Sequence, residues 1–111
     1  YLVRVRWLAN CNPIRYSVTM IQSFRHKGLE KFFAAGSKKG IRPEHAERLK
    51  DIMFRLHFAH KIEDMGFPGS RLHSLHGKYV GFWSVTVSGN WRVIFRFEQG
   101  HASEVNYVDY H

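Results

Sequence analysis

Two stretches of the chain show apolar residues at helical spacing. In the first, residues 27–35, the residues Leu29, Phe32 and Phe33 recur on one helical face. Gly36 follows directly and is suited to end the helix, because glycine adopts the left-handed backbone conformation at little cost. The sequence therefore predicts a short helix over 27–35.

The second stretch, residues 43–59, has the stronger helical pattern. Pro43 suits the first helical turn, and Glu44 and Glu47 favour the positive N-terminal end of the helix. One apolar stripe runs along the segment and is formed by Ala46, Leu49, Ile52, Met53, Leu56 and Ala59. We expect this stripe to pack against a sheet.

The remaining regular segments read as strands, because apolar positions alternate with a period of two. The strand candidates are 21–25, 71–75, 82–87, 91–98 and 102–110. In 91–98, one face is apolar and is formed by Trp91, Val93, Phe95 and Phe97. The opposite face carries Arg92, Ile94 and Arg96.

Tight turns connect the last three strand candidates and predict their register. A three-residue loop at Ser88-Gly89-Asn90 places Val87 opposite Trp91. A two-residue loop at Gln99-Gly100 places Tyr107 opposite Arg92, which puts Asp109 and His111 on the face of Arg92. A slip of one residue would reverse this last inference.

Together these elements predict an α+β domain. Two N-terminal helices would pack on one face of a small, mostly antiparallel, twisted sheet of about four to five strands. Residues 1–19 show no clear helical or strand period, and an ordered pattern begins directly after Met20. We therefore expect 20–111 to form the domain and 1–19 to be an N-terminal extension, non-native or outside the core fold. The alternative is that residues 2–8 add an edge strand.

The composition narrows the class of partner. The chain has 111 residues and a formal net charge of +8. This basic excess favours a polyanionic partner, with nucleic acid first, although a merely soluble basic protein would have the same charge. The single cysteine, Cys11, excludes an internal disulfide and fits a reducing compartment. No apolar run approaches the roughly 20 residues that a membrane helix needs.

Three segments carry residues suited to acid–base chemistry and phosphate binding. They are Leu72-His73-Ser74-Leu75-His76-Gly77-Lys78, Gly89-Asn90-Trp91-Arg92 and the terminal Asp109-Tyr110-His111. RNA supplies its own nucleophile, the 2′-OH, so its cleavage needs a base, an acid and positive charge at the phosphate. Histidine titrates near neutral pH and arginine stays protonated, so this set is suited to cutting RNA without a metal.

Each of these residues also has a structural interpretation. A histidine in a strand is more often a surface or structural residue than a catalyst, and Arg92 could simply pair with Asp109 across the hairpin. Lys38 and Lys39 could form an ordinary solvated turn, or contact RNA through charge alone. A zinc site would need the four imidazoles of two H-x-x-H pairs, His57 with His60 and His73 with His76. No acidic cluster accompanies them, so we expect no metal and no other cofactor.

Several motifs, specific only as a set, identify a family. They are Gly81-Phe82-Trp83-Ser84, Asn90-Trp91-Arg92 and Asp109-Tyr110-His111, together with Leu72-His73-Ser74-Leu75 and the segment 20–29. With them, residues 20–111 resemble the HigB-type toxins of the RelE/ParE superfamily, which belong to bacterial type II toxin–antitoxin modules.

The resemblance implies a ribosome-dependent mRNA endonuclease. Such a toxin enters the A site of the 70S ribosome and cuts the exposed codon of the mRNA. A cognate HigA-like helix-turn-helix antitoxin would neutralise it, and DNA would be contacted only indirectly, through the toxin–antitoxin complex. The resemblance implies no membrane partner and places the protein in the bacterial cytoplasm.

The resemblance also assigns the site. Its catalytic residues correspond to His73, Arg92, Asp109, Tyr110 and His111. Many relatives carry a lysine three residues after the first histidine, where this chain has His76, and Lys78 could replace that lysine. The residues expected to contact RNA are His76, Lys78, Asn90, Lys38 and Lys39.

The expected roles follow from the side-chain chemistry. Arg92 would clamp the phosphate, and His73 and His111 would divide the acid–base work, in an order that the sequence leaves open. Asp109 would act as a base or orient a histidine. Tyr110 would stack on a base or bind phosphate.

Two other functions stay open on the sequence alone. A ParE-like relative would poison DNA gyrase without nuclease chemistry, and a non-catalytic module would only bind RNA or its antitoxin. Arg92 and the terminal Asp109-Tyr110-His111 favour RNA cleavage over both.

Overall fold

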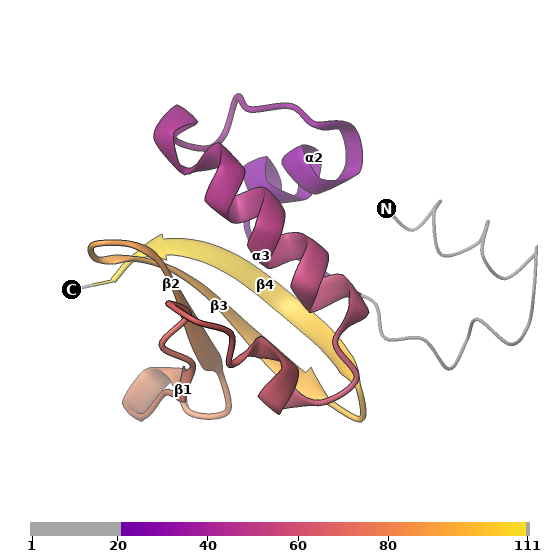
Figure 1. The fold of residues 1–111 in the computed structure, drawn as a ribbon, viewed down its shortest axis with the longest axis vertical. Helices are drawn as coiled ribbons and strands as arrows, with labels where there is room; N and C mark the ends of the chain where they lie inside the picture. The colour runs from indigo at the N-terminus through magenta and orange to yellow at the C-terminus, as the bar shows by residue number, and fades with distance from the viewer. Residues whose placement is uncertain (1–20, 111) are drawn as a thin grey trace, which may run out of the picture.

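The computed structural model describes residues 21–110, in which two helices lie on one face of a four-stranded antiparallel sheet (Figure 1). The helices are α2 (Lys27–Ala35) and α3 (Ala46–Phe58). The strands follow one another across the sheet in chain order and are β1 (His73–Ser74), β2 (Trp83–Ser88), β3 (Trp91–Glu98) and β4 (His101–Asp109). This arrangement confirms the predicted α+β architecture. The predicted extension 1–19, Cys11 and His111 lie outside the described residues.

Both helices begin and end where local chemistry favours it. At the start of α2, the Nδ1 atom of His26 accepts a hydrogen bond from the backbone N–H of Leu29 at 2.9 Å. At its end, Gly36 takes the left-handed conformation with φ 76°, as predicted. Pro43 opens a short 3₁₀ turn, η2 (Pro43–His45), which leads directly into α3.

Two further 3₁₀ turns complete the fold. They are η3 (Ile62–Met65), which follows α3, and η4 (Gly77–Tyr79), which lies between β1 and β2. No helix within residues 21–110 is long and apolar enough to cross a membrane.

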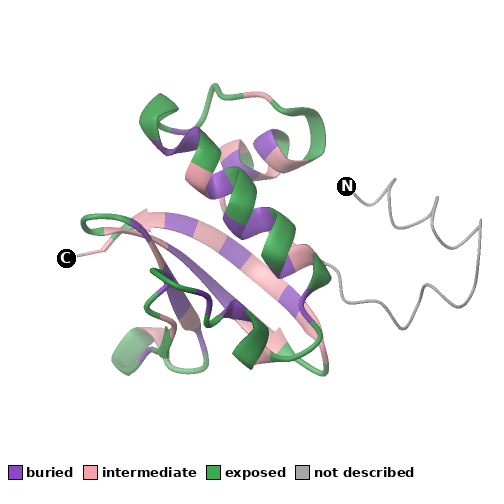
Figure 2. Cartoon of the chain, in the orientation of Figure 1, coloured by how far each residue is buried: buried purple, intermediate pink, exposed green. Residues whose placement is uncertain are grey.

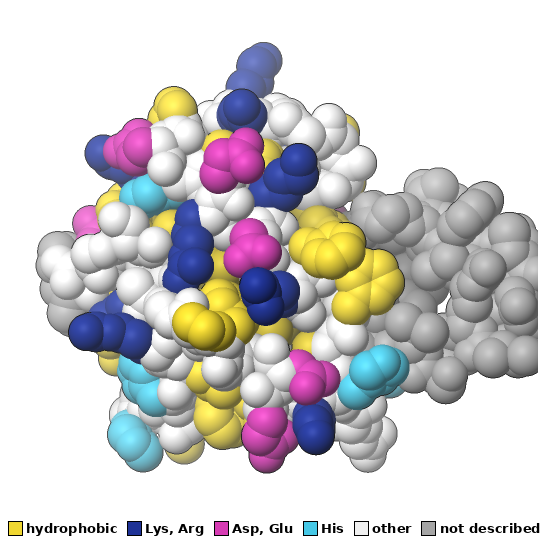
Figure 3. All heavy atoms as spheres, in the orientation of Figure 1, with side chains coloured by type: hydrophobic (Ala, Val, Ile, Leu, Met, Phe, Trp, Pro, Cys, Tyr) yellow, Lys and Arg dark blue, Asp and Glu magenta, His cyan; other side chains and the backbone are white. Residues whose placement is uncertain are grey.

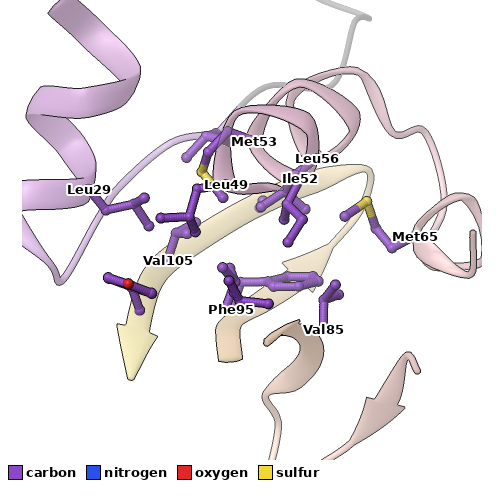
Figure 4. Close-up of a cluster of buried hydrophobic side chains, with 14 of the residues drawn as sticks. Leu29, Leu49, Ile52, Met53, Leu56, Met65, Val85, Phe95 and Val105 are labelled. Atoms are coloured by element: carbon purple, nitrogen blue, oxygen red, sulfur yellow. The ribbon is translucent and has the colours of Figure 1, made fainter. Parts of the chain in front are cut away.

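The core lies between the helices and the sheet (Figure 4). Figure 2 shows the consequence for α3, along which buried and exposed positions alternate with the helical turn. The predicted stripe is buried on the sheet side and meets the alternate side chains Val85, Val93, Phe95 and Tyr107 from three strands. The Tyr107 hydroxyl lies 2.7 Å from Nδ1 of the buried His45, which gives both polar groups a partner inside the core.

The register between β3 and β4 corrects one prediction. Near the turn, Glu98 pairs with His101 and Arg96 with Ser103, as a two-residue loop requires. A bulge then shifts the register by one, so that Arg92 pairs with Val108 rather than with Tyr107. Asp109 therefore lies opposite Trp91, and the predicted placement of Asp109 on the face of Arg92 is wrong.

The bulge has a clear physical origin at Glu104, whose backbone has the unusual φ of 51° for a non-glycine residue. The backbone N–H of Glu104 donates to Oγ of Ser23 at 2.8 Å, and its carboxylate accepts from Nε of Arg96 at 3.1 Å. Ile21 and Phe24 form isolated parallel bridges to Ala102 and Val105 beside it. The strand candidate at 21–25 is thus an extended segment that fixes the bulge.

The turn between β2 and β3 also differs from the prediction. Ser88 pairs with Trp91 across a two-residue Gly89-Asn90 loop, so the predicted three-residue loop is wrong. Thr86 pairs with Arg92, and Val87 is the extra residue of a bulge between Thr86 and Ser88. The bulge keeps Val87 buried in the core while the loop is shortened.

Candidate active site

The site residues gather on the face of the sheet that the helices leave uncovered, called here the open face. His73 pairs with Ser84, which pairs with Ile94, and directly paired residues point to the same side of a sheet. Arg92 is two residues from Ile94 on the same strand, so it shares that side. The intervening Val93 belongs to the core under the helices. His73 and Arg92 therefore share the open face.

A small apolar cluster supports this face. Its buried members are Leu75, Phe82 and Ile94, and three partly buried residues pack against it, namely Tyr79, Val108 and Tyr110. Because these residues come from β3, β4 and the chain on either side of η4, the cluster holds the loop of η4 against the sheet. The loop that carries Lys78 is thereby brought beside the end of β4.

His73 is exposed, and its tautomer is fixed by a backbone contact. Its Nδ1 atom lies 2.9 Å from the carbonyl oxygen of Arg71. Since a carbonyl oxygen only accepts, Nδ1 carries the proton, and Nε2 of the neutral ring is left with its lone pair. Arg71 itself has φ 51°, a backbone conformation that turns its carbonyl within reach of the ring. The histidine thus presents a basic nitrogen away from the backbone.

Arg92 is half-buried and held by the neighbouring strand. Its Nη1 donates to Oγ1 of Thr86, the residue directly opposite it in the sheet. Its Nε is buried and has no hydrogen-bond partner among residues 21–110. A buried donor without a partner is uncommon and often marks a functional position. The guanidinium is therefore fixed in place without being saturated by protein acceptors.

A pocket of about 260 Å³ opens at the end of β4 and is lined by Lys78, Tyr79, Val108, Asp109 and Tyr110. The rings of Tyr79 and Tyr110 are 6.0 Å apart, and Nζ of Lys78 lies 5.3 Å from the centre of the Tyr79 ring. Val108 pairs with Arg92, so the pocket adjoins the guanidinium. Asp109 reaches the pocket although the sheet pairing places it opposite Trp91, because β4 ends at this residue.

The other predicted contact residues divide between two regions. The Asn90 carbonyl oxygen accepts a hydrogen bond from the backbone N–H of Tyr110 at 2.8 Å, which anchors the chain end beside the pocket. His76 precedes η4 and is exposed. Lys38 lines a different groove, between α2 and α3, and Lys39 follows it in the same turn. The structure therefore does not bring these two lysines to the open face.

The four imidazoles of the zinc alternative do not come together. Within residues 21–110, no three side chains of the metal-binding types gather closely enough to hold an ion. His57 instead packs between the rings of Phe33 and Phe58, at 5.4 and 4.9 Å between ring centres.

Comparison with known proteins shows which family this chain belongs to. Residues 22–111 match the family model of the RelE-like toxin HigB of type II toxin–antitoxin systems. The chain is also 39% identical over 92 residues to Endoribonuclease HigB of Proteus vulgaris, an alignment that covers 83% of this chain and 100% of that protein. The chain belongs to the HigB-like toxins. The resemblance found in the sequence motifs is confirmed, and membership implies a cognate antitoxin as partner.

Two residues of this HigB-like site were missed by sequence reasoning. Thr86 holds the guanidinium of Arg92, and the only signal for it would have been the correct register of the β2–β3 hairpin. Tyr79 forms one wall of the pocket, and its position directly after Lys78 is a basic–aromatic pair of the kind that binds single-stranded nucleic acid.

Proposed function

We propose that this HigB-like toxin is an endoribonuclease that cleaves mRNA in the ribosomal A site without a metal. The RNA 2′-OH is the nucleophile, and a HigA-like antitoxin neutralises the toxin. The observation that carries the proposal is the open face itself. It combines a guanidinium whose Nε has no partner among residues 21–110, a histidine held at Nδ1 by a backbone carbonyl and a tyrosine-lined pocket within one surface.

The spacing of these groups fits a strand of RNA. His73 and Arg92 lie two strands apart across the sheet and two residues apart along the strand. In a regular sheet, this spacing places their backbones about 12 Å apart. Both side chains extend from the same face, so a phosphate bound by Arg92 lies between the histidine and the pocket. The pocket walls, Tyr79 and Tyr110, offer ring faces for an unstacked base, and Lys78 adds a positive charge beside them.

The cleavage reaction needs a base, an acid and a positive charge at the phosphate. A base accepts the 2′-OH proton while the 2′ oxygen bonds to phosphorus, and the bond from phosphorus to the 5′ oxygen breaks. An acid then protonates the leaving 5′ oxygen. His73 and His111 share these two transfers, and Arg92 stabilises the charge that develops on the phosphoryl oxygens. Asp109 either orients one of these histidines or replaces one of them as the general base. Tyr110 stacks on a nucleobase.

The proposal is tested by replacing Arg92 with alanine. We expect cleavage of a translated message to fall about 10²–10³-fold, because a fixed donor to the developing oxyanion is lost. Arg92→Lys should recover only part of the activity, since it keeps the charge but loses the planar geometry. The measurement is primer extension on mRNA from cells that briefly express each variant.

The matched control is Arg55→Ala, which removes an exposed arginine on the outer side of α3. It should cut mRNA as the unaltered chain does. Unchanged cleavage by Arg92→Ala would remove Arg92 from the mechanism. Growth arrest by the unaltered chain without mRNA cuts, but with gyrase-linked DNA breaks, would overturn the nuclease proposal, and a chain with no effect on growth would point to a binding module.

A further inference from the structure

Arg48 reaches from the helix layer to the edge of the sheet and contacts two segments that lead to the candidate active site. It lies on α3, is half-buried and places its guanidinium over the ring of Phe67, 5.4 Å from the ring centre. Its Nη2 donates to the carbonyl oxygen of Gly69 at 2.9 Å and to that of Thr86 at 3.3 Å. Gly69 precedes β1 and Thr86 lies in β2, so one side chain of α3 joins both segments.

Thr86 turns its backbone toward Arg48 and its side chain toward Arg92. Its N–H donates to the carbonyl oxygen of Ser70 at 2.8 Å, and its own carbonyl oxygen accepts from Arg48. Both backbone groups therefore point away from β3, because the N–H and C=O of one strand residue face the same neighbour in an antiparallel sheet. On the open face, its Oγ1 accepts from Nη1 of Arg92. A change in how the backbone of Thr86 is held would move the acceptor of that guanidinium.

The carbonyl groups of residues 69–71, directly before β1, accept three hydrogen bonds in succession. The first comes from Arg48, the second from the N–H of Thr86 and the third from Nδ1 of His73. The backbone is left-handed at the first and the third of these positions, with φ of 84° and 51°. This short segment therefore sets the position of His73 against the same residue, Thr86, that holds Arg92.

Attraction of RNA by charge does not account for the position of Arg48. It lies on the helix layer, on the side of the sheet away from Arg92 (Figure 1). Figure 3 shows that lysine and arginine side chains on this face are interspersed with carboxylates and apolar side chains. Arg55, also on α3, lies over the same ring of Phe67 at 4.4 Å, but its Nε donates to the carboxylate of Asp51. The two arginines thus share the aromatic contact and differ in their hydrogen bonds.

We propose that Arg48 is a positioning residue of the cleavage site, which fixes the guanidinium of Arg92 relative to the imidazole of His73. It acts on Arg92 through Thr86 and on His73 through residues 69–71. The inference rests on the proposed nuclease function, because Arg92 and His73 are the groups assigned to the phosphate and to proton transfer. Their relative position is a property of the free chain, so it is measured without RNA.

The first test is nuclear magnetic resonance of the full chain in the absence of RNA. Arg48→Met removes the hydrogen-bond donors and keeps the apolar stem of the side chain. We expect it to shift the Nε–H signal of Arg92 and to move His73 away from the tautomer protonated at Nδ1, as read from the ring ¹⁵N shifts. The matched control is Arg55→Met, which removes the neighbouring guanidinium over the same ring and should change neither signal.

The second test is cleavage of mRNA on programmed ribosomes. Arg48→Met should lower kcat about tenfold and change KM less than about twofold, since a displaced phosphate clamp slows the chemical step more than it weakens binding. Arg48→Lys keeps a positive donor and should reduce the loss to about threefold. In an Arg92→Ala background, Arg48→Met should cost less than about twofold, because the group that it positions is already absent. Arg55→Met should cleave like the unaltered chain.

Unchanged Arg92 and His73 signals in Arg48→Met would overturn the proposal. A loss of cleavage that recurs in full in the Arg92→Ala background would also overturn it, since Arg48 would then serve only the fold. If Arg48→Met lowers the thermal midpoint more than Arg55→Met does, Arg48→Lys replaces it in both tests, with smaller changes in the same direction expected. If the unaltered chain cuts no mRNA, the nuclease proposal fails, and the resonance test still decides whether Arg48 positions the two groups.

Discussion

The helix-covered face of the sheet and its open face each hold a histidine whose Nδ1 hydrogen bond is defined, and the two bonds run in opposite directions. On the covered side, Nδ1 of His26 accepts from the N–H of Leu29, so its proton sits on Nε2. On the open face, Nδ1 of His73 donates to the Arg71 carbonyl, so Nε2 is the basic atom. Protonation would break the bond of His26 and leave that of His73 intact.

The side chains around the two histidines also differ in how far they are buried. The covered face is made of fully buried side chains from both helices and three strands, and a capping histidine there serves the fold. The open face has only a small apolar cluster, beside which an exposed histidine and a half-buried arginine remain accessible. The side chains that stabilise the fold and the candidate catalytic side chains thus lie on opposite sides of one sheet. Mutations on the covered side should change stability, and mutations on the open face should change activity.

The largest effect is expected from Phe95→Ala on the covered side. Phe95 is 0% exposed and lies at the centre of the core beneath α3. Truncating it leaves a cavity, and we expect the free energy of unfolding to fall by about 3–5 kcal/mol, measured by urea denaturation. The matched control is Phe54→Ala at an exposed position, for which a change within about 0.5 kcal/mol is expected. Equal losses of unfolding free energy in the two variants would contradict this prediction.

The next effect concerns activity on the open face. His73→Gln removes the basic Nε2 but leaves an exposed position that the fold does not need. We expect cleavage on programmed ribosomes to slow about 10²–10⁴-fold, with a change in unfolding free energy below about 1 kcal/mol. His60→Gln, at an exposed site after α3, should cleave normally. Activity within a factor of two of the unaltered chain would exclude His73 as an acid–base group.

The smallest effect is a pH dependence of stability through His26. Burial lowers the pKa of His26 below its ordinary value of 6.5, and a smaller contribution from a hydrogen bond with the backbone of His26 itself opposes this shift. The folded state then favours the neutral ring, so the unfolded chain binds more protons below pH 6.5. This contribution to stability is complete above that pH and is lost as the pH falls toward the lowered pKa.

The acid dependence has its own test. His26→Asn keeps a side-chain acceptor at the start of α2 but does not titrate in this range. We expect its unfolding free energy to depend less steeply on pH between about 7 and 5 than that of the unaltered chain, in urea titrations at each pH. The same slope in both chains would show that His26 does not contribute.

Much of the fold follows from local pattern. The helix at 27–35 and the strand at 91–98 have the predicted bounds, since their apolar periodicity and the flanking glycines act within a few residues. The alternation in β3 also gave the correct division of side chains, with Phe95 toward the core and Arg92 on the other face. His73 was placed in a strand for the same local reason.

The active-site geometry depended on contacts that local pattern does not encode. Asp109 was assigned to the wrong side because the bulge at Glu104 shifts β4 by one residue, and that bulge is held by Ser23, about 80 positions away in the sequence. The sequence by itself determined the two helices, the core face of β3 and the family, because periodicity and motifs are properties of the chain. Only the tertiary structure decided that Val108 and Tyr110, rather than Asp109, share the face of Arg92, because the register of a sheet is fixed by long-range hydrogen bonds.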